Sequence, residues 1–356
     1  MARKKIIPIF VPHQGCPHDC IFCNQQKITG VSTDMTGEKT REIIEESLKT
    51  IDLDAEIEIA FFGGSFTAID KEKQIELLSV AKEYKDKKIV KDIRMSTRPD
   101  CIDEEELQLI KDYGATIIEL GVQSMDEGVL LESLRGHKAD VVYESSKLIK
   151  EFGFTLGLQM MVGLPTDSEE KCIYTAKEFI KIKPSFVRIY PTLVIKDTGL
   201  ENAYKEGYYK SFELDESINI VKKLIVLYTI NDIKIIRVGL QATDDIQLGI
   251  DVIAGPYHPA FRELVDSRMI RDYLESILPR EFKEIVIASS NSHISTIVGN
   301  KRCNRKFIND EYKAKFKTRR DNSLKDKMSI EVDGKVIDEI SFKEMISKLE
   351  KIYGLC

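Results

Sequence analysis

The sequence contains no run of 18 apolar residues, so no segment has the length that a membrane-spanning helix needs. The first ten residues begin basic, but their apolar stretch is short, is interrupted by Pro8 and precedes no small-residue cleavage site. We therefore expect no signal peptide. Tandem repeats and low-complexity tracts are also absent. These absences predict a cytoplasmic protein with no membrane partner.

The chain has 356 residues, of which 42% are hydrophobic, and this length suits two domains or one large barrel with an appendage. Its net charge is −6, but the charge is unevenly distributed. Residues 291–330 contain 11 Lys or Arg against 4 Asp or Glu, a local +7 that leaves −13 for the remainder. This asymmetry indicates an anionic partner for the basic segment.

The first two-thirds of the chain alternates β-branched apolar runs with amphipathic stretches that begin on polar residues. The expected strands are Ile6–Val11, Ile57–Phe62, Ile93–Ser96, Thr116–Val122, Thr155–Met161, Phe186–Tyr190 and Ile233–Val238. The expected helices are Thr36–Thr50, Lys71–Tyr84, Asp103–Tyr113, Val141–Phe152, Ser168–Ile182 and Leu214–Thr229. Repeated strand–helix units predict an α/β fold, a partial (β/α)6-type TIM barrel, with its chemistry at the C-terminal ends of the strands.

The pattern changes after Thr243. We expect residues 1–245 to form the barrel, residues 246–280 a linking helical segment, and residues 281–356 a small basic α+β domain. The last domain is predicted to run strand, helix, turn, helix, strand, strand, helix.

The chain has seven cysteines, an odd number that favours ligands or thiols over disulfides. Three lie within eight residues, Cys16, Cys20 and Cys23, and the other four are interpreted as buried or spare thiols. Thiolates are the ligands of iron–sulfur clusters, and three ligands leave one iron of a four-iron cluster open. The alternative is a zinc site with His13 or His18 as the fourth ligand.

The spacing Cys-x3-Cys-x2-Cys, with the aromatic Phe22 before the last cysteine, resembles the signature of the radical S-adenosylmethionine (SAM) superfamily. The resemblance implies that Cys16, Cys20 and Cys23 hold a [4Fe–4S] cluster whose open iron chelates SAM. Reductive cleavage of SAM would then give methionine and a 5′-deoxyadenosyl radical. An electron donor such as ferredoxin or flavodoxin is implied as a partner.

Further motifs within residues 6–245 resemble the radical SAM domain of the Elongator catalytic subunit family, whose members modify wobble uridines of tRNA. The motifs are Phe62-Gly-Gly-Ser-Phe-Thr67, Ser96-Thr-Arg-Pro-Asp100, Glu119-Leu-Gly-Val-Gln-Ser124, Arg135-Gly-His137, Ile189–Ile195, Thr198-Gly-Leu200 and Gly207-Tyr-Tyr209. A weaker likeness exists to oxygen-independent coproporphyrinogen oxidases.

The resemblance implies particular roles. Gly63 and Gly64, followed by Ser65, would let the backbone approach the amino group of SAM. Arg135 would pair with the SAM carboxylate. Positions that approach the ribose or methionine moiety are Ser96, Gln123 and Gln159. Arg98 and Tyr190 are candidates to face the substrate or to anchor the structure.

The sequence also departs from the Elongator pattern. The cysteine spacing is shorter, and Ser96 stands where an acidic residue is common. The residues after 250 are too few for the family's acetyltransferase domain, and no acetyl-CoA pyrophosphate loop is recognisable. Carboxymethylation from acetyl-CoA is therefore not expected to carry over.

The basic segment resembles a KH domain, which clamps single-stranded RNA at a GxxG turn. Its turn reads Gly299-Asn-Lys-Arg302, so the second glycine is absent. Candidate phosphate contacts are Lys301, Arg302, Arg305 and Lys306. The alternative is an α/β cap with a solvated basic face.

The sequence therefore predicts a radical SAM enzyme, a transferase or oxidoreductase, that modifies a nucleotide in tRNA or another RNA. One alternative is a radical SAM oxidoreductase acting on a small molecule such as a porphyrin precursor. A second is a zinc-stabilised RNA-binding protein without enzymatic activity.

Overall fold

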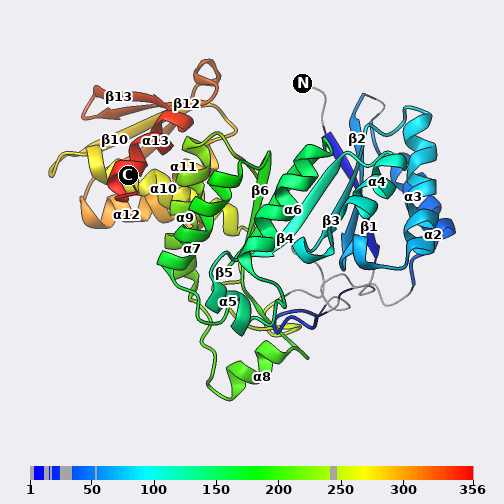
Figure 1. Cartoon of the computed structure of the whole chain (residues 1–356). Coiled ribbons are helices and arrows are strands. Elements are labelled where there is room, and N and C mark those ends of the chain that lie inside the picture. The colour runs from blue at the N-terminus through cyan, green and yellow to red at the C-terminus, as the bar shows by residue number, and fades with distance from the viewer. Residues whose placement is uncertain are drawn as a thin grey trace. The chain divides into compact units, whose positions relative to one another are not determined.

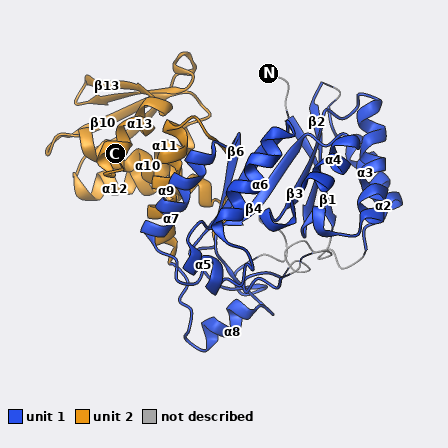
Figure 2. Ribbon diagram, in the orientation of Figure 1, with its two compact units in different colours: residues 1–212, 240–257 blue, residues 213–239, 258–356 orange. Residues whose placement is uncertain are grey.

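The computed structural model describes residues 4–11, 16, 18–24, 34–52, 54–240 and 247–355. His13, one of the alternative zinc ligands, lies outside the described residues. Two compact units account for the chain (Figure 2): unit 1 comprises residues 1–212 and 240–257, and unit 2 comprises residues 213–239 and 258–356. Unit 2 thus contains residues 213–239 and 258–280 together with the C-terminal residues. The domain boundaries expected at residues 245 and 280 stay a prediction.

Unit 1 contains strands β1 to β6, which lie in chain order in one sheet with each strand parallel to the next (Figure 1). They are β1 (Lys4–Val11), β2 (Glu56–Gly63), β3 (Asp92–Thr97), β4 (Ile117–Gln123), β5 (Thr155–Val162) and β6 (Phe186–Pro191). Short strands β7 (Val194–Ile195) and β9 (Val252–Ala254) pair separately. The predicted α/β partial barrel is confirmed.

Helices connect the strands, and several of them pack against the sheet (Figure 1). They are α2 (Gly37–Leu48), α3 (Lys71–Asp86), α4 (Glu104–Asp112), α5 (Glu127–Glu132), α6 (Ala139–Glu151), α7 (Glu169–Ile182) and α8 (Gly199–Lys205), with 3₁₀ turns η1 (Phe66–Ala68) and η2 (Pro99–Cys101). Side chains at the N-caps accept backbone hydrogen bonds and fix where several helices begin: Thr36, Asp70, Asp103, Ser168 and Thr198. The sequence-based prediction did not include α5 and α8.

The core of unit 1 lies between the sheet and these helices. Strand residues such as Ile59 and Ile93 are fully buried, as are Leu77 and Leu107 on the helices. Each such side chain contributes about 1.5–3 kcal/mol through burial of apolar surface. Because the apolar residues face the helices, the opposite face of the sheet is left for polar side chains.

Unit 2 contains a mixed sheet in the order β11-β10-β12-β13, with β10 parallel to β11 and antiparallel to β12. Its elements are α9 (Leu214–Ile230), β8 (Lys234–Val238), α10 (Phe261–Ile277), β10 (Glu284–Ser289), α11 (Ile294–Val298), η3 (Asn300–Arg302), α12 (Cys303–Glu311), β11 (Lys315–Arg320), η4 (Asn322–Leu324), β12 (Lys327–Val332), β13 (Lys335–Ser341) and α13 (Phe342–Ile352). Helices α9, α10 and α13 pack against one another.

The sequence-based prediction missed β13. The predicted turn at Asp333 and Gly334 is present, with φ angles of 48° and 83°. Such angles suit a two-residue hairpin turn, and the chain therefore returns as β13 beside β12 instead of leading directly to the last helix. The KH-like interpretation of these residues stays a prediction.

Within the described ranges, no helix combines the length and the apolar character that crossing a bilayer requires.

Candidate active site at the C-terminal ends of the strands

The loop that carries the three cysteines is anchored to two other parts of unit 1. The backbone N–H of Ile21 donates to the carbonyl of Ser133 at 3.2 Å, and the carbonyl of Ile21 accepts from Leu200 at 2.7 Å. The N–H of Cys23 donates to the carbonyl of Cys20 at 2.9 Å. The loop is therefore tied to the residues that follow α5 and to the start of α8.

The three cysteines differ in their surroundings. Cys20 is buried, whereas Cys16 and Cys23 are partly exposed. Burial raises the pKa of the Cys16 thiol, although a hydrogen bond from the Ser65 backbone and the charge of Arg98 act in the opposite direction. Among the described residues, no three His, Cys, Asp or Glu side chains are arranged to hold a metal ion. The assignment of all three cysteines as ligands therefore stays a prediction.

Phe22 packs among the apolar residues of this region. It contacts a buried cluster formed by Val194, Leu200 and Tyr209. The predicted aromatic residue of the cysteine run therefore helps to hold the loop against β7 and α8. His18, the other alternative zinc ligand, is exposed. Its ring lies against Gly136, so closely that a Cβ atom on residue 136 would be only 2.3 Å from the ring.

The turn at the end of β2 explains the need for a glycine at position 63. Gly63 has a φ of +118°, and a Cβ there would lie 2.2 Å from the carbonyl oxygen of Val11. The N–H of Gly64 donates to the same carbonyl at 3.2 Å. Gly63 therefore lets β2 lie close to the end of β1. Gly64, Ser65 and Ser96 also line one small pocket at the ends of β2 and β3.

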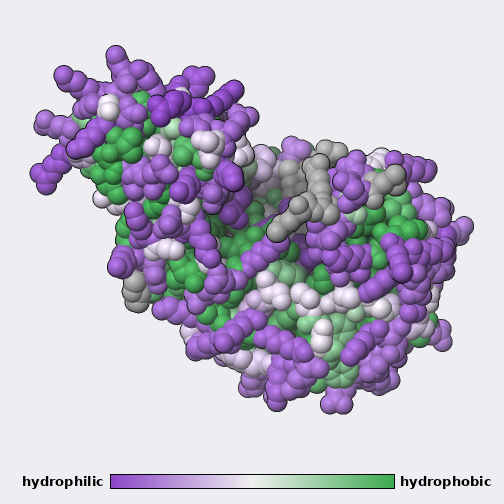
Figure 3. Space-filling view, turned by 90° about the horizontal axis from the view of Figure 1, so that it is seen from above, coloured by the Kyte–Doolittle hydropathy of each residue, from purple (hydrophilic) through white to green (hydrophobic). Residues whose placement is uncertain are grey.

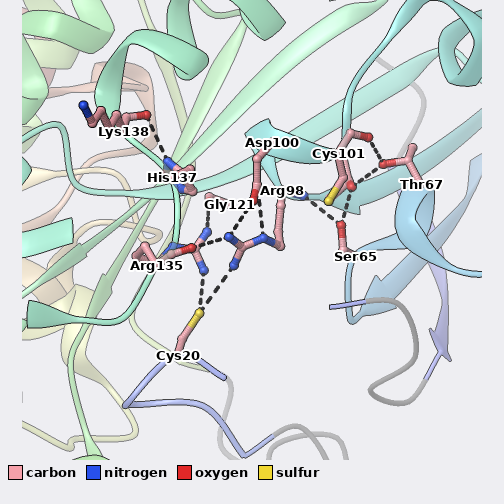
Figure 4. A network of polar contacts seen from close by, with 11 residues as sticks. Cys20, Ser65, Thr67, Arg98, Asp100, Cys101, Gly121, Arg135, His137 and Lys138 are labelled. Carbon is pink, nitrogen blue, oxygen red and sulfur yellow. Dashed lines mark hydrogen bonds and ion pairs between the residues drawn. The ribbon is translucent and has the colours of Figure 1, made fainter. Parts of the chain in front are cut away.

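Ser65 belongs to a buried network of hydroxyl groups. Its Oγ lies 2.8 Å from Oγ1 of Thr97, which in turn lies 2.6 Å from Oγ1 of Thr67. Ser65 Oγ also accepts from the backbone N–H of Arg98 at 3.2 Å (Figure 4). Burial raises the pKa of the neighbouring Cys101 thiol, and its hydrogen bond with Ser65 acts in the opposite direction.

The strand register places three predicted site residues on one face of the sheet. Paired residues of parallel strands share a face, as do residues two apart along a strand. Ser96 pairs with Glu119, Gly121 with Gln159, and Gln159 with Arg188, so Ser96, Gln159 and Tyr190 lie on the same polar face. Gln159 Nε2 donates to Gln123 Oε1 at 3.3 Å, and Gln123 itself has a positive φ of 74° at an irregularity in β4.

Tyr190 is held by the polar residues beneath it. Its hydroxyl accepts from Arg188 Nη1 at 3.1 Å, and Arg188 Nε lies 2.8 Å from Glu119. Arg94 lies between two glutamates, with its Nη1 3.3 Å from Glu119 Oε2 and its Nε 2.6 Å from Glu58 Oε1. This ionic network of Glu58, Arg94, Glu119 and Arg188 was not predicted from the sequence, because its members come from four different strands.

Arg98 and Arg135 meet at Cys20. Arg135 Nη1 donates to Cys20 Sγ at 3.1 Å and Arg98 Nη1 at 3.5 Å (Figure 4). Both arginines are buried, with exposed fractions of 4% for Arg98 and 5% for Arg135. The structure thus directs both guanidinium groups at a predicted cluster ligand, while the predicted contacts of Arg135 with SAM and of Arg98 with a substrate stay predictions.

Asp100 and His137 complete this group. Burial raises the pKa of Asp100, but hydrogen bonds from Arg98 and its charge outweigh that effect, so the pKa lies below its ordinary value. Burial and the charge of Arg135 lower the pKa of His137 to about 4. Its Nδ1 lies 3.1 Å from the carbonyl of Lys138, so a neutral imidazole donates there.

These residues fit an iron–sulfur cluster bound through thiolates. Cys20 Sγ has N–H donors on two guanidinium groups, which stabilise negative charge on sulfur. Hydrogen-bond donors and positive charge at a ligand sulfur are features that suit an anionic cluster.

The four candidate phosphate contacts lie in unit 2 around the turn that precedes α12. Lys301, Arg302 and Lys306 are exposed, and Arg305 is half-buried with its guanidinium 6.0 Å from the centre of the Phe316 ring. Lys301 and Arg302 have positive φ angles of 49° and 63°. Hydrophilic side chains project from much of the visible surface of unit 2, the lobe at upper left in Figure 3.

Comparison with known families agrees with this geometry. The family described as the radical SAM superfamily matches residues 10–179, and the Radical_SAM C-terminal domain matches residues 184–271. Members of this superfamily use a [4Fe–4S] cluster and SAM, which favours a cluster over the zinc alternative.

Curated relatives match over part of the chain. Elongator complex protein 3 of Dictyostelium discoideum is 38% identical over 139 residues, covering 38% of this chain and 25% of that protein. The human protein is 36% identical over 152 residues, covering 41% and 28%. An uncharacterized protein of Methanocaldococcus jannaschii is 29% identical over 221 residues, covering 58% and 67%. The matched region thus spans about a quarter of the length of the Elongator relatives.

A solved structure supports the fold. The archaeal Elp3 of Methanocaldococcus infernus, with an N-terminal deletion, superposes with a TM-score of 0.59 at 24% identity. The superposition covers 78% of this chain and 63% of that chain.

Proposed function

Because the chain belongs to the radical SAM superfamily, whose members are enzymes, we propose that it generates a 5′-deoxyadenosyl radical to modify a nucleotide in tRNA or another RNA. The observation that carries the RNA substrate is the exposed basic turn at Lys301 and Arg302, on a chain whose radical SAM region resembles Elongator proteins. Ferredoxin or flavodoxin is the proposed electron donor, and the cytoplasm the proposed location.

The cysteines would hold the cluster. Cys16, Cys20 and Cys23 come from one anchored loop, and their thiolates would bind three irons. When bound, the cluster and SAM supply the radical that abstracts a hydrogen atom. The chain itself would bind and orient SAM. Gly63 and Gly64 would let the backbone approach its amino group, and the Gln123–Gln159 pair presents amide groups on the polar face. Ser96 lies on that same face.

An exposed aromatic residue offers unit 1 a contact with RNA bases. The side chain of Tyr208 is 85% exposed. Its backbone is fixed, because the N–H groups of Tyr208 and Tyr209 both donate to the carbonyl of Ala203 and the Tyr209 hydroxyl donates to Gly163 at 2.5 Å. A ring presented from a rigid backbone suits stacking on an unpaired base.

The test is the formation of 5′-deoxyadenosine by anaerobically reconstituted protein with SAM and dithionite, with and without total tRNA. We expect tRNA to increase turnover, and replacement of Cys20 by alanine to abolish it. Tyr208→Ala should reduce the stimulation by tRNA, whereas Tyr174→Ala, at another exposed tyrosine, should not.

Turnover that is indifferent to tRNA would contradict the RNA substrate and favour the small-molecule alternative. Protein that contains zinc, no acid-labile sulfide and no SAM-cleaving activity would contradict the radical mechanism.

A further inference from the structure

The sulfur of Cys20 accepts hydrogen bonds from two buried arginines. One bond comes from Arg135 Nη1 at 3.1 Å and a second from Arg98 Nη1 at 3.5 Å. All three side chains are buried. Figure 4 shows the two guanidinium groups converging on the sulfur from separate segments of the chain. For Cys16, by contrast, the hydrogen bond comes from the Ser65 backbone.

Other residues hold the two guanidinium groups in this orientation. Asp100 accepts from Arg98 Nε and Nη2, both at 2.9 Å, in a bidentate pair. Arg98 Nη2 also donates to the carbonyl of Arg135, and Arg135 Nη2 donates to the carbonyl of Gly121. The donors that face Cys20 are therefore oriented by hydrogen bonds that do not involve the sulfur.

The reduction potential of an iron–sulfur cluster depends on the net charge of the cluster and on the hydrogen bonds that its sulfurs accept. An added electron makes the cluster more negative, so N–H donors and positive charge at a ligand sulfur stabilise the reduced form more than the oxidised form. Two buried guanidinium groups at one sulfur provide both effects, and burial limits their screening by water.

We propose that Arg98 and Arg135 are positioning residues for the cluster, which fix the Cys20 sulfur and raise the reduction potential of the cluster. The step concerned is the transfer of one electron from a low-potential reductant to the cluster, with no bond formed or broken in the protein. This inference rests on the proposed cluster site and is independent of the RNA substrate.

The experiment is a redox titration of the full chain, reconstituted with iron and sulfide under anaerobic conditions, in the absence of SAM. Dithionite is the reductant, and electron paramagnetic resonance reports the reduced cluster. Without SAM, the readout does not depend on any contact of Arg135 with the SAM carboxylate.

The variants are Arg98→Gln and Arg135→Gln, each of which removes one charged donor. We expect each to lower the reduced-to-oxidised ratio at a fixed potential about tenfold, which is a shift of about 59 mV for one electron. Arg98→Lys and Arg135→Lys keep the positive charge but lack the planar guanidinium group, and they should shift the reduction potential less. The control is Arg268→Gln, a partly buried arginine of α10 that contacts Asp215 and Asn219, and its potential should equal that of the wild type.

Iron and sulfide content and circular dichroism distinguish the outcomes. A Gln variant that folds but loses the cluster supports the positioning role, provided that its Lys counterpart retains the cluster. Gln variants that keep a full cluster at the wild-type potential would overturn the inference and leave the proposed function intact. Wild-type protein that assembles no four-iron cluster would overturn both.

Discussion

At the scale of single residues, Gly63 shows how one backbone conformation determines the turn beside the cysteine loop. Its φ of +118° is unfavourable for any residue with a side chain, and the Val11 carbonyl leaves no room for a Cβ. The glycine pair was predicted from the sequence as a place where the backbone approaches a ligand. The structure adds that Gly63 is also needed for the approach of β2 to β1.

We expect Gly63→Ala to destabilise the protein by about 3 kcal/mol or more, because unfavourable φ and overpacking both contribute. Gly207→Ala is the control, since Gly207 has a φ of +81° and nothing within 4 Å of an added Cβ. That control should cost only about 1–2 kcal/mol. Urea unfolding followed by circular dichroism measures both, and equal losses would contradict the steric explanation.

The lowered pKa of His137 predicts that the stability of the protein depends on pH. Its folded pKa of about 4 lies below the ordinary value of 6.5, because of burial and the charge of Arg135. The unfolded state therefore binds more protons between these two values, and the free energy of unfolding falls as the pH falls from about 6.5 to 4. The loss amounts to at most about 3 kcal/mol.

Urea unfolding at several pH values checks this expectation. His137→Gln cannot titrate, so its stability should change less across the same window than that of the wild type. Parallel pH profiles for the two proteins would show that His137 does not produce the dependence.

At the scale of elements, two glutamates on strand β2 illustrate how burial changes the importance of an ion pair. Glu58 is fully buried and contacts Lys4 and Arg94 Nε, each at 2.6 Å. Glu56, two residues earlier, pairs with Lys91 at 2.8 Å with both side chains about half exposed. Removing one member of a buried pair leaves an uncompensated charge, whereas solvent screens an exposed pair.

We expect Glu58→Gln to destabilise the protein by about 3–5 kcal/mol. Glu56→Gln should have a much smaller effect, because solvent screens this pair. Because both residues belong to the same strand, chemical denaturation of the two variants compares like with like. Similar losses for both would mean that the ionic network of Glu58, Arg94, Glu119 and Arg188 does not link the strands energetically.

Secondary structure was predictable where a periodic pattern was long. All six strands of the unit 1 sheet and the longer helices agree with their apolar periodicity. The prediction missed α5 and α8, which are only six and seven residues long. It also missed β13, where Lys335, Val336 and Ile337 are all exposed, so no alternation of apolar and polar residues indicates a strand.

At the scale of the whole molecule, the basic turn of unit 2 is the feature proposed to recruit RNA. Lys301→Ala combined with Arg302→Ala removes two exposed charges. We expect tRNA binding to weaken and the dependence of log affinity on log salt concentration to become shallower by about 1–2, because fewer counterions are released. Fluorescence anisotropy at several potassium chloride concentrations measures the slope.

The control for this double variant removes the same charge elsewhere on unit 2. Lys335 and Lys351 are exposed and lie outside the basic turn, on β13 and α13. Their double alanine variant should keep the wild-type slope. If both double variants lose the same affinity, the effect reflects overall charge, and the basic turn is not a specific RNA contact.

The sequence by itself predicted the alternation of strands and helices, the glycine pair at the end of β2 and the superfamily. These could be predicted because periodicity and short motifs are local properties of the chain. The tertiary structure decided what surrounds the motifs. Arg98 and Arg135 meet Cys20 from positions 78 and 115 residues away, and Glu58, Arg94, Glu119 and Arg188 come from four strands. No spacing in the sequence encodes these contacts, since they depend on the register of parallel strands and the course of the loops at their C-terminal ends.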